Sequence, residues 1–348
     1  AELPRGAEVR LSGAEVRPAG GDGPSDTPHD AALDVAAGVG LTLRVDRDGF
    51  AGLVSDGSEI VIGDGTPRFA VLAREGDVVI ATVIAPGRLG PGKGVTVTNA
   101  RANGASFTAK DEHDLAAAVE LRAEFVAVSY VRCADDITAM RRRLNDAGSR
   151  ARLIAKIEQR EAYECLDEIL AAADGVMVAR GDLGVAVGSE RVPLIQKDII
   201  RRATQIGKLV ITATQMLESM IHSSEPTRAE AADIANAVID GSSAVMLSAE
   251  TSSGSYPVES VTKMAAIAAA AEAEEIHGAR DEHLAEPRDV AVMHAALYLS
   301  HATAAVALVA PTSTGNTPRA CAKYRPKKPI VAIADDAVVA AQLNAEWG

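Results

Sequence analysis

Apolar and polar residues alternate in two different ways along this chain, and the period changes near Lys110. Before that point, short alternating runs are separated by Gly, Pro and Asp, which is typical of strands joined by turns. The expected strands include 41–45, 59–62, 68–72 and 77–83. After it, short apolar runs alternate with longer amphipathic stretches, as in strands followed by helices. The pattern predicts an all-β domain followed by α/β structure.

Five strand–helix units follow one another in the second part. The expected strands are 125–130, 152–157, 175–178, 210–212 and 244–247, and the helices are 134–147, 162–173, 192–206, 227–240 and 257–273. Strands that alternate with helices predict a parallel sheet with right-handed crossovers. A last segment has helices at 289–302 and 317–324 and strands at 304–310 and 329–333. We therefore expect three domains, at 1–104, 105–275 and 276–348.

Polar segments end several of these strands. They are Lys156–Glu158, Ala179–Asp182, Thr212–Gln215 and Ser248–Thr251, and each follows a short apolar run. In a (β/α) barrel the active site is built where the strands end, so repeated polar strand ends predict such a site.

Glu158 and Asp182 are the candidate metal ligands. Mg²⁺ is typically held by one or two carboxylates and completes its octahedron with water and substrate oxygens. Lys156 lies two residues before Glu158, so both side chains share one face of the strand. A cation there suits stabilisation of an enolate or a phosphoryl group. The alternatives are acids that cap helices and a plain Lys156–Glu158 ion pair.

The next two strand ends offer groups for a substrate. Gly181 in the run Ala179, Arg180, Gly181, Asp182 allows close approach of the backbone to a ligand, and its amides are suited to a carboxylate. Thr214 offers a hydroxyl that could orient a substrate or relay a proton. A helix cap or a core hydroxyl is the ordinary role of such a threonine.

Two further phosphate-binding candidates lie outside the sheet. Lys93 occupies a glycine-flanked turn of the β domain, where it could contact nucleotide phosphates or stay solvated. A strand-to-helix loop offers hydroxyls and amides to an anion, or simply caps the helix. Its residues are Thr312, Ser313, Thr314, Gly315, Asn316 and Thr317.

Composition narrows the class of protein. A net charge of −13 argues against nucleic acid, because phosphate backbones need a concentrated basic face. The three cysteines have no paired spacing, which favours a reducing cytoplasm over a disulfide framework. No apolar run approaches the about 20 residues that cross a bilayer, so we expect no membrane partner.

Several long runs resemble pyruvate kinase. They are 155–158, 175–185, 192–200, 211–220, 225–228 and 244–251. Residues 1–103 resemble the family's lid domain, and 276–348 resemble the start of its C-terminal effector domain, including Lys323–Pro326. The resemblance implies an α/β fold: a partial (β/α)8 barrel of five units with an all-β lid and an incomplete C-terminal α/β domain.

The resemblance also implies a reaction, phosphoryl transfer from phosphoenolpyruvate to ADP to give pyruvate and ATP. By that resemblance Lys156 is the catalytic lysine, Glu158 and Asp182 hold Mg²⁺ or Mn²⁺, and Thr214 lies beside the reacting carbon. The backbone of Ala179–Asp182 binds the substrate carboxylate, Lys93 contacts the nucleotide, and 312–317 bind the phosphate of an effector. The family pattern is a homo-oligomer, usually a tetramer.

Other features depart from the family. The first three barrel strands, with a substrate-binding arginine and the K⁺ ligands, normally precede the lid and are not found here. Ala249 and Ser255 replace a usual Gly and a frequent Lys. Three interpretations follow: a piece of an ordinary pyruvate kinase with impaired activity, a divergent metal-dependent enolate enzyme such as an oxaloacetate decarboxylase, or a non-catalytic paralogue that pairs with another chain.

Overall fold

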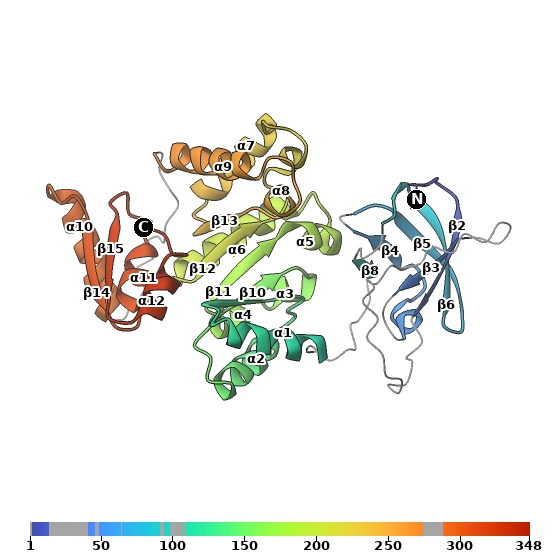
Figure 1. Ribbon diagram of the computed structural model, residues 1–348, viewed down its shortest axis with the longest axis horizontal. Helices are drawn as coiled ribbons and strands as arrows, with labels where there is room; N and C mark the ends of the chain where they lie inside the picture. Colours follow the sequence, from blue (N-terminus) through green and yellow to red (C-terminus); the bar gives the residue numbers. More distant parts are fainter. Residues whose placement is uncertain are drawn as a thin grey trace. The chain divides into compact units, whose positions relative to one another are not determined.

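The structure is a computed structural model. It describes residues 2–13, 41–45, 49–63, 65–90, 94–97, 107, 109–273 and 288–348. The chain forms two compact units, Ala1–Ala105 and Ser106–Gly348, and Figure 1 colours both along the sequence. No helix in the described ranges is both long and apolar enough to cross a membrane.

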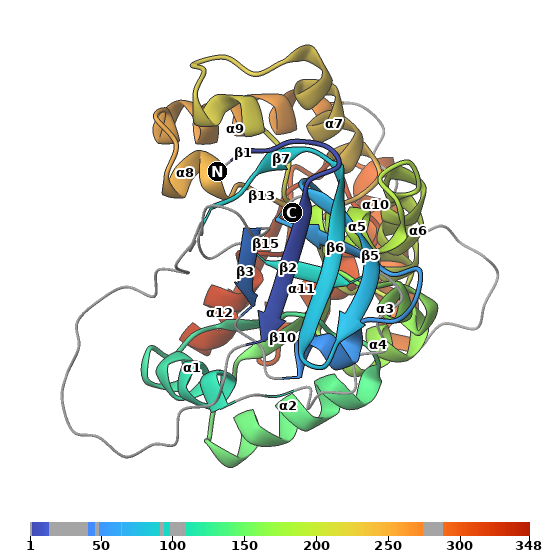
Figure 2. The same ribbon diagram turned by 90° about the vertical axis from the view of Figure 1, so that its right-hand side faces the viewer.

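The first unit is built of β-strands. Its main sheet has six strands in the order β3-β2-β6-β5-β4-β8, antiparallel except for the parallel pair β2 and β3. Figure 2 faces β2, β6 and β5, which lie side by side. The elements are β1 (Glu2–Leu3), β2 (Glu8–Gly13), β3 (Leu41–Val45), the 3-10 helix η1 (Phe50–Leu53), β4 (Glu59–Ile62), β5 (Arg68–Glu75), β6 (Val78–Ala85), β7 (Gly87–Arg88) and β8 (Val95–Val97).

Alternation explains the core of this unit. Val9 and Leu11 on β2 are fully buried, and so are Val79 and Ala81 on the neighbouring strand β6. Successive side chains of a strand point to opposite faces, so every second residue reaches the core. This confirms the predicted all-β fold.

The second unit contains the predicted parallel sheet, in the order β9-β10-β11-β12-β13. Its strands are β9 (Phe125–Val128), β10 (Arg152–Ile157), β11 (Gly175–Ala179), β12 (Leu209–Ala213) and β13 (Ala244–Met246). Its helices are α1 (Ala109–Glu120), α2 (Ala134–Asp146), α3 (Arg160–Glu164), α4 (Leu166–Ala172), α5 (Arg180–Val187), α6 (Val192–Gln205), η2 (Glu218–Ile221), α7 (Arg228–Ile239), α8 (Ala249–Ser252) and α9 (Pro257–Glu272). Each strand lies beside the next strand in sequence, which confirms a partial barrel.

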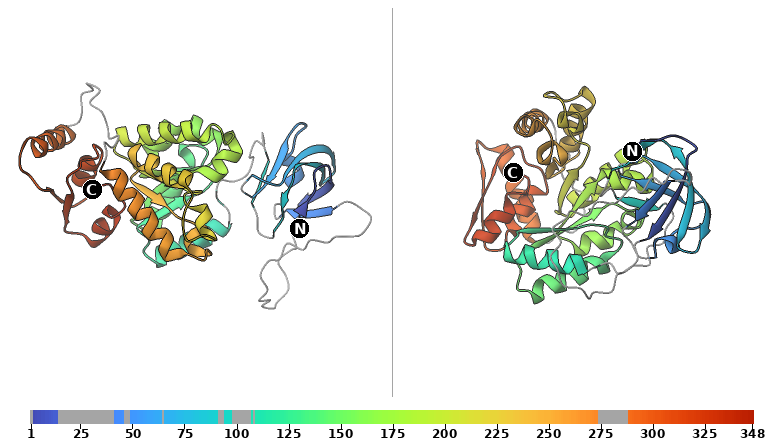
Figure 3. Two further views of the ribbon diagram at one scale, coloured as in Figure 1. Left: turned by 90° about the horizontal axis from the view of Figure 1, so that it is seen from above. Right: turned by 45° about the vertical axis from the view of Figure 1, so that its right-hand side comes forward.

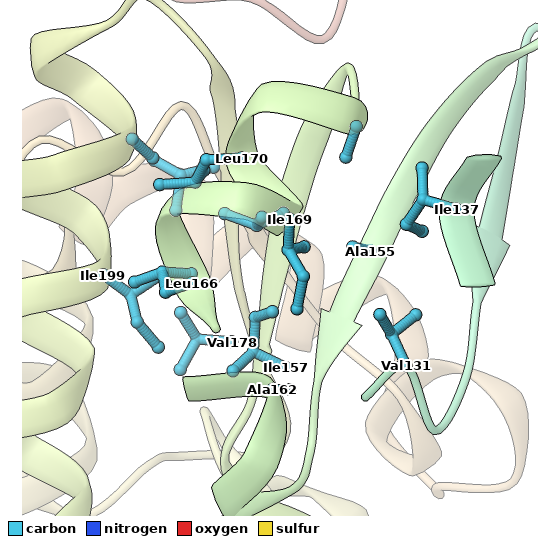
Figure 4. Packing of buried hydrophobic residues seen from close by; sticks show 14 of the residues in the cluster. Val131, Ile137, Ala155, Ile157, Ala162, Leu166, Ile169, Leu170, Val178 and Ile199 are labelled. Atoms are coloured by element: carbon cyan, nitrogen blue, oxygen red, sulfur yellow. The ribbon is translucent and has the colours of Figure 1, made fainter. Parts of the chain in front are cut away.

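The two faces of the sheet have separate clusters of apolar side chains. Leu153, Ala155 and Ile157 of β10 pack with residues of α2, α4 and α6, where each fully buried Leu or Ile contributes roughly 1.5–3 kcal/mol. Figure 4 shows Ala155 and Ile157 among Ile137, Leu166, Ile169 and Ile199. Ile154 belongs to a different cluster, with Met177 and Leu209. Because side chains alternate, Lys156 shares the Ile154 face, away from the helices.

Helix starts follow the local sequence. Thr227 Oγ1 accepts a hydrogen bond from Glu230 N at 3.2 Å, and Glu230 Oε2 accepts one from Thr227 N at 2.8 Å. This capping box fixes the first turn of α7. Pro257 begins α9, where its lack of an N–H costs nothing. Helices α7 and α9 pack against each other, as Figure 3 shows.

A smaller parallel sheet completes the second unit. It pairs β14 (Leu308–Thr312) with β15 (Ile330–Ala334), and its helices are α10 (Arg288–Ala302), α11 (Asn316–Ala322) and α12 (Ala337–Leu343). Arg325 joins it to the larger sheet: Nη2 donates to Gly241 O at 2.7 Å. Gln342 also donates to Arg150 O at 2.9 Å. The domain boundary expected at residue 276 stays a prediction.

Some element bounds differ from those expected. The strand expected to reach Tyr130 ends at Val128, because Tyr130 has φ 54° and leaves the extended region. The helix expected over 162–173 is two helices that meet at Cys165. Ala179 ends β11, and Arg180–Asp182 begin helix α5, a helix that the sequence pattern did not predict.

Candidate active site

Lys156 and Glu158 lie at the end of β10 as expected. The Lys156 ammonium donates to Ser129 Oγ at 2.9 Å and lies 2.6 Å from Glu158 Oε1. Glu158 is only 1% exposed, and its Oε2 accepts a hydrogen bond from Tyr130 N at 2.6 Å. Tyr130 adopts its left-handed conformation in the turn that brings this N–H to the carboxylate.

One oxygen of Glu158 is left without a hydrogen bond. Oε1 is buried, and the Lys156 ammonium beside it forms an ion pair whose geometry does not give a hydrogen bond. A buried carboxylate oxygen normally has such partners, because desolvation is costly. Carboxylate oxygens are the donors that Mg²⁺ prefers, and Oε1 has a lone pair beyond the one that faces the ammonium, so the residues present suit the dication expected here.

Asp182 is the third residue of α5, one turn beyond the end of β11. It is partly buried and has interactions of its own. Burial raises the pKa of Tyr130, and the negative charges of Asp182 and Glu158 raise it further. Both carboxylates therefore act on the same phenol. That they share one ion stays a prediction.

The donor set around these carboxylates is small. Over the ranges that the structure describes, no group of three or more His, Cys, Asp or Glu side chains could hold a metal. A dication held by Glu158 and Asp182 would complete its shell with substrate and water oxygens, as Mg²⁺ commonly does.

The start of α5 faces Thr214. Ala179 precedes the first turn, and Gly181 N donates to Thr214 Oγ1 at 2.9 Å. The strand register places Ala179 opposite Ala213, so Arg180 and Thr214 follow at the same level. A Cβ added to Gly181 would meet only Thr214 Oγ1, at 3.7 Å. This side of the helix start is open, which suits close approach of an anion to the amides.

The fourth strand-end segment has a structural role. Glu250 is 3% exposed, and its carboxylate accepts hydrogen bonds from Leu217 N at 3.1 Å and Ser248 N at 2.7 Å. Its oxygens hold the chain before η2 and at the start of α8. Glu250 thus has partners in the backbone where Glu158 Oε1 has none.

Sequence reasoning missed Ser129 and Tyr130. They end strand β9 as Lys156 and Glu158 end β10, so the strand-end rule applied to β9 would have found them. It also missed the side chain of Arg180, since the motif drew attention to its backbone. An arginine at the start of a helix gives no sign in the sequence that it turns inward.

The two other candidate phosphate sites, Lys93 and Thr312–Thr317, are far in sequence from Lys156 and Glu158. Lys93 lies outside the described residues. Thr312–Thr317 joins β14 to α11, and Thr312 Oγ1 accepts from Gly315 N at 2.8 Å. Arg319 donates to Thr314 O at 2.9 Å and pairs with Glu346 at 2.8 Å. The loop is thus fixed by side chains, while its anion role stays a prediction.

Comparison with known families gives two matches along the chain. The family model "Pyruvate kinase, barrel domain" matches residues 31–261, and "Pyruvate kinase, alpha/beta domain" matches residues 290–348. The chain belongs to the pyruvate kinase family. This confirms the resemblance inferred from the sequence motifs, and the match covers the sheet, α5 and Thr312–Thr317.

Individual pyruvate kinases give the same result. That of Clostridium acetobutylicum is 43% identical over 303 residues, 85% of this chain and 63% of the relative. That of Geobacillus stearothermophilus is 43% identical over 316 residues, 85% of this chain and 51% of the relative. That of Sporosarcina psychrophila is 38% identical over 334 residues, 92% of this chain and 56% of the relative. The chain thus spans less than two thirds of the length of these pyruvate kinases.

Proposed function

We propose that this chain carries the metal- and enolate-binding part of a pyruvate kinase site, which transfers a phosphoryl group from phosphoenolpyruvate to ADP. One observation carries the proposal: the Glu158 carboxylate is buried at the end of β10, and its Oε1 lies 2.6 Å from the Lys156 ammonium. A carboxylate and an ammonium side by side at a strand end are the groups that a dication and a phosphoryl group in transit need.

Each side chain takes one role in this proposal. Glu158 and Asp182 hold Mg²⁺ or Mn²⁺. When bound, the dication supplies positive charge that stabilises a developing enolate oxygen. The Lys156 ammonium, 24% exposed and held by Ser129, lies beside the phosphoryl group in transit and stabilises its charge.

Thr214 supports protonation of the enolate carbon. Its Oγ1 already accepts the Gly181 N–H, so its own hydroxyl proton points to another acceptor. That proton can be passed toward a substrate. The amides beside Gly181 at the start of α5 receive the substrate carboxylate, because helix N-termini favour anions.

The remaining roles depend on the family. We assign Lys93 to the nucleotide phosphates and Thr312–Thr317 to a phosphorylated effector. K⁺ use, a homo-oligomeric state and a cytoplasmic location belong to the same proposal. Divergent enolate chemistry is the second candidate, because Lys156, Glu158, Asp182 and Thr214 are the residues that decarboxylation of oxaloacetate would also need.

The test compares two reactions of the 348-residue chain. ATP formation from phosphoenolpyruvate and ADP is measured with Mg²⁺ and K⁺, and oxaloacetate decarboxylation is measured with Mn²⁺. Lys156→Met should lower the observed rate about 10²–10³-fold, as expected for loss of a group that stabilises transition-state charge. Lys110→Met removes an exposed lysine and is the matched control.

The outcomes separate the candidates. ATP formation that Lys156→Met abolishes supports the kinase. Decarboxylation without ATP formation supports the enolate enzyme. If neither reaction is detected and Mn²⁺ binding still depends on Glu158, the result supports a non-catalytic binding protein. Mn²⁺ binding that ignores Glu158→Gln contradicts the proposal.

A further inference from the structure

We propose that the side chain of Arg180 is a positioning residue, which holds the turn at Thr214 and Gln215 in its left-handed conformation. The role proposed here belongs to the guanidinium of Arg180, whereas the proposed substrate contact uses the backbone of Ala179–Asp182. It rests on the proposed function only in giving Thr214 a place beside the substrate. Arg180 begins α5, and it is 6% exposed.

The turn after β12 is strained. Thr214 has φ 66° and Gln215 has φ 53°, two successive non-glycine residues in the left-handed region. The Cβ of an L-residue crowds the backbone there, and Thr is β-branched, so the surrounding structure must maintain the conformation. Without support the turn would relax to ordinary backbone angles and move the Thr214 hydroxyl.

The Arg180 guanidinium supplies that support. Its Nε donates to Thr214 O at 3.1 Å, and its Nη2 donates to Thr214 O at 2.5 Å and Gln215 O at 3.0 Å. Its Nη1 donates to Asp233 Oδ2 at 2.5 Å and Gln196 Oε1 at 3.5 Å. All five N–H groups of the arginine are therefore directed to acceptors.

Charge and topology explain why an arginine is needed. A buried cation requires a partner, and Asp233 of α7 provides it. The planar fork reaches two successive carbonyls on one side and α6 and α7 on the other. A lysine has three donors on a single nitrogen and cannot bridge these groups.

One hydrogen bond, from Gly181 N to Thr214 Oγ1, connects the turn held by Arg180 to the candidate site. With both carbonyls held, Thr214 Oγ1 stays 2.9 Å from Gly181 N. Arg180 and Gly181 are adjacent, so one residue holds the turn and the next donates its N–H to the Thr214 hydroxyl oxygen. The open side of the helix start and the Thr214 hydroxyl are thereby kept in one arrangement.

The test measures amide hydrogen exchange, which does not depend on turnover. In Arg180→Lys, exchange at the Gly181 amide should be at least about tenfold faster, the equivalent of one lost charge-assisted hydrogen bond. Exchange at Val178 in β11 should change less. Arg325→Lys is the matched control: an arginine with the same 6% exposure that also holds backbone carbonyls, far from Thr214 in sequence. In Arg325→Lys, amide exchange at Gly181 should change no more than exchange at Val178.

A second substitution tests the strain directly. Glycine adopts positive φ at no steric cost, so Gln215→Gly should stabilise the turn without the guanidinium. The double variant Arg180→Lys with Gln215→Gly should bring Gly181 exchange back toward the wild-type rate. Gln215 is exposed, so little packing is lost.

The outcomes are distinct. Selective acceleration at Gly181 with rescue by Gln215→Gly supports the proposal, even if no reaction is detected in any variant. Unchanged Gly181 exchange in folded Arg180→Lys, or no rescue, overturns it, even if the enzyme turns over. If Arg180→Lys does not fold, Asp233→Asn replaces it. That variant removes only the counter-charge and should accelerate Gly181 exchange in the same direction, and no acceleration overturns the proposal.

Discussion

Arg180 and Arg325 are two equally buried arginines that donate to backbone carbonyls at opposite ends of the parallel sheet. Arg180 lies at the carboxyl edge, where β11 and β12 end, and it holds a strained turn with Asp233 as its counter-charge. Arg325 lies at the amino edge, where it donates to Gly241 O before β13 begins. The same chemistry thus serves two different parts of the sheet.

Compensation of charge differs between the two edges. Around Arg325 the acceptors are Gly241 O, Ala322 O and Ser243 Oγ, and the Trp347 ring lies 5.4 Å away. Burial lowers the pKa of Arg325 to about 10, and Glu346 opposes this shift, so the guanidinium is still charged at neutral pH. The amino edge joins parts of the fold, whereas the carboxyl edge keeps a strained turn and the buried Glu158 carboxylate paired with Lys156. That contrast is expected where one edge has a function.

The largest expected difference between the carboxyl and amino edges comes from substitution of Glu158. Glu158→Gln should lower Mn²⁺ affinity about 100-fold or more, because a ligand counts for at least as much as its supporting residues. The loss in the free energy of unfolding should be small by comparison, since the Lys156 ammonium that loses its partner is 24% exposed and stays hydrated. Mn²⁺ titration and urea unfolding measure the two quantities. A large loss of stability would place Glu158 with the structural residues.

Arg325→Met should have the reverse effect. It leaves the buried Gly241 O and Ala322 O without their donor, which costs about 1–3 kcal/mol in the free energy of unfolding. Mn²⁺ affinity should not change. Urea unfolding and the Mn²⁺ titration again check both, with Arg325→Lys as the milder comparison. If Arg325→Met weakens Mn²⁺ binding as strongly as Glu158→Gln does, the two edges are not independent.

The sequence predicts the two edges unequally. Apolar runs followed by Lys156, Glu158 and Asp182 located the strands and their polar ends, because burial and strand period depend on residue type. The left-handed angles of Tyr130 and Thr214 could not be predicted. Those angles are fixed by contacts with residues 28 and 34 positions away, Glu158 and Arg180. Neither residue has a local preference for positive φ, so only the folded structure reveals the turn.

A smaller effect is expected at Ser129, which holds Lys156. Ser129→Ala removes the hydroxyl that accepts from the Lys156 ammonium at 2.9 Å. One hydrogen bond is worth about 0.5–1.5 kcal/mol, so turnover should fall about 2- to 10-fold with little change in KM. Steady-state kinetics of whichever reaction the chain catalyses give the answer, with Ser252→Ala as an exposed serine control. Equal rates in the two variants would show that Ser129 does not position Lys156.

The smallest effect concerns Glu230, which also belongs to the carboxyl edge but is satisfied. Burial raises its pKa, yet hydrogen bonds from Ser219 and Thr227 prevail and lower the pKa below its ordinary value. A carboxylate with a lowered folded-state pKa adds stability above its unfolded pKa of about 4.3, and this is lost as pH falls through the folded value. The stability advantage of wild type over Glu230→Gln should therefore be constant above about pH 5 and shrink below about pH 4.

Urea unfolding at several pH values, from below about pH 4 to above about pH 5, measures that advantage, with Glu218→Gln as a control that removes an exposed carboxylate of η2. An advantage that persists unchanged at low pH would mean that the hydrogen bonds do not depend on the charge of Glu230. Glu230 should add stability when ionised, because its oxygens have four donors.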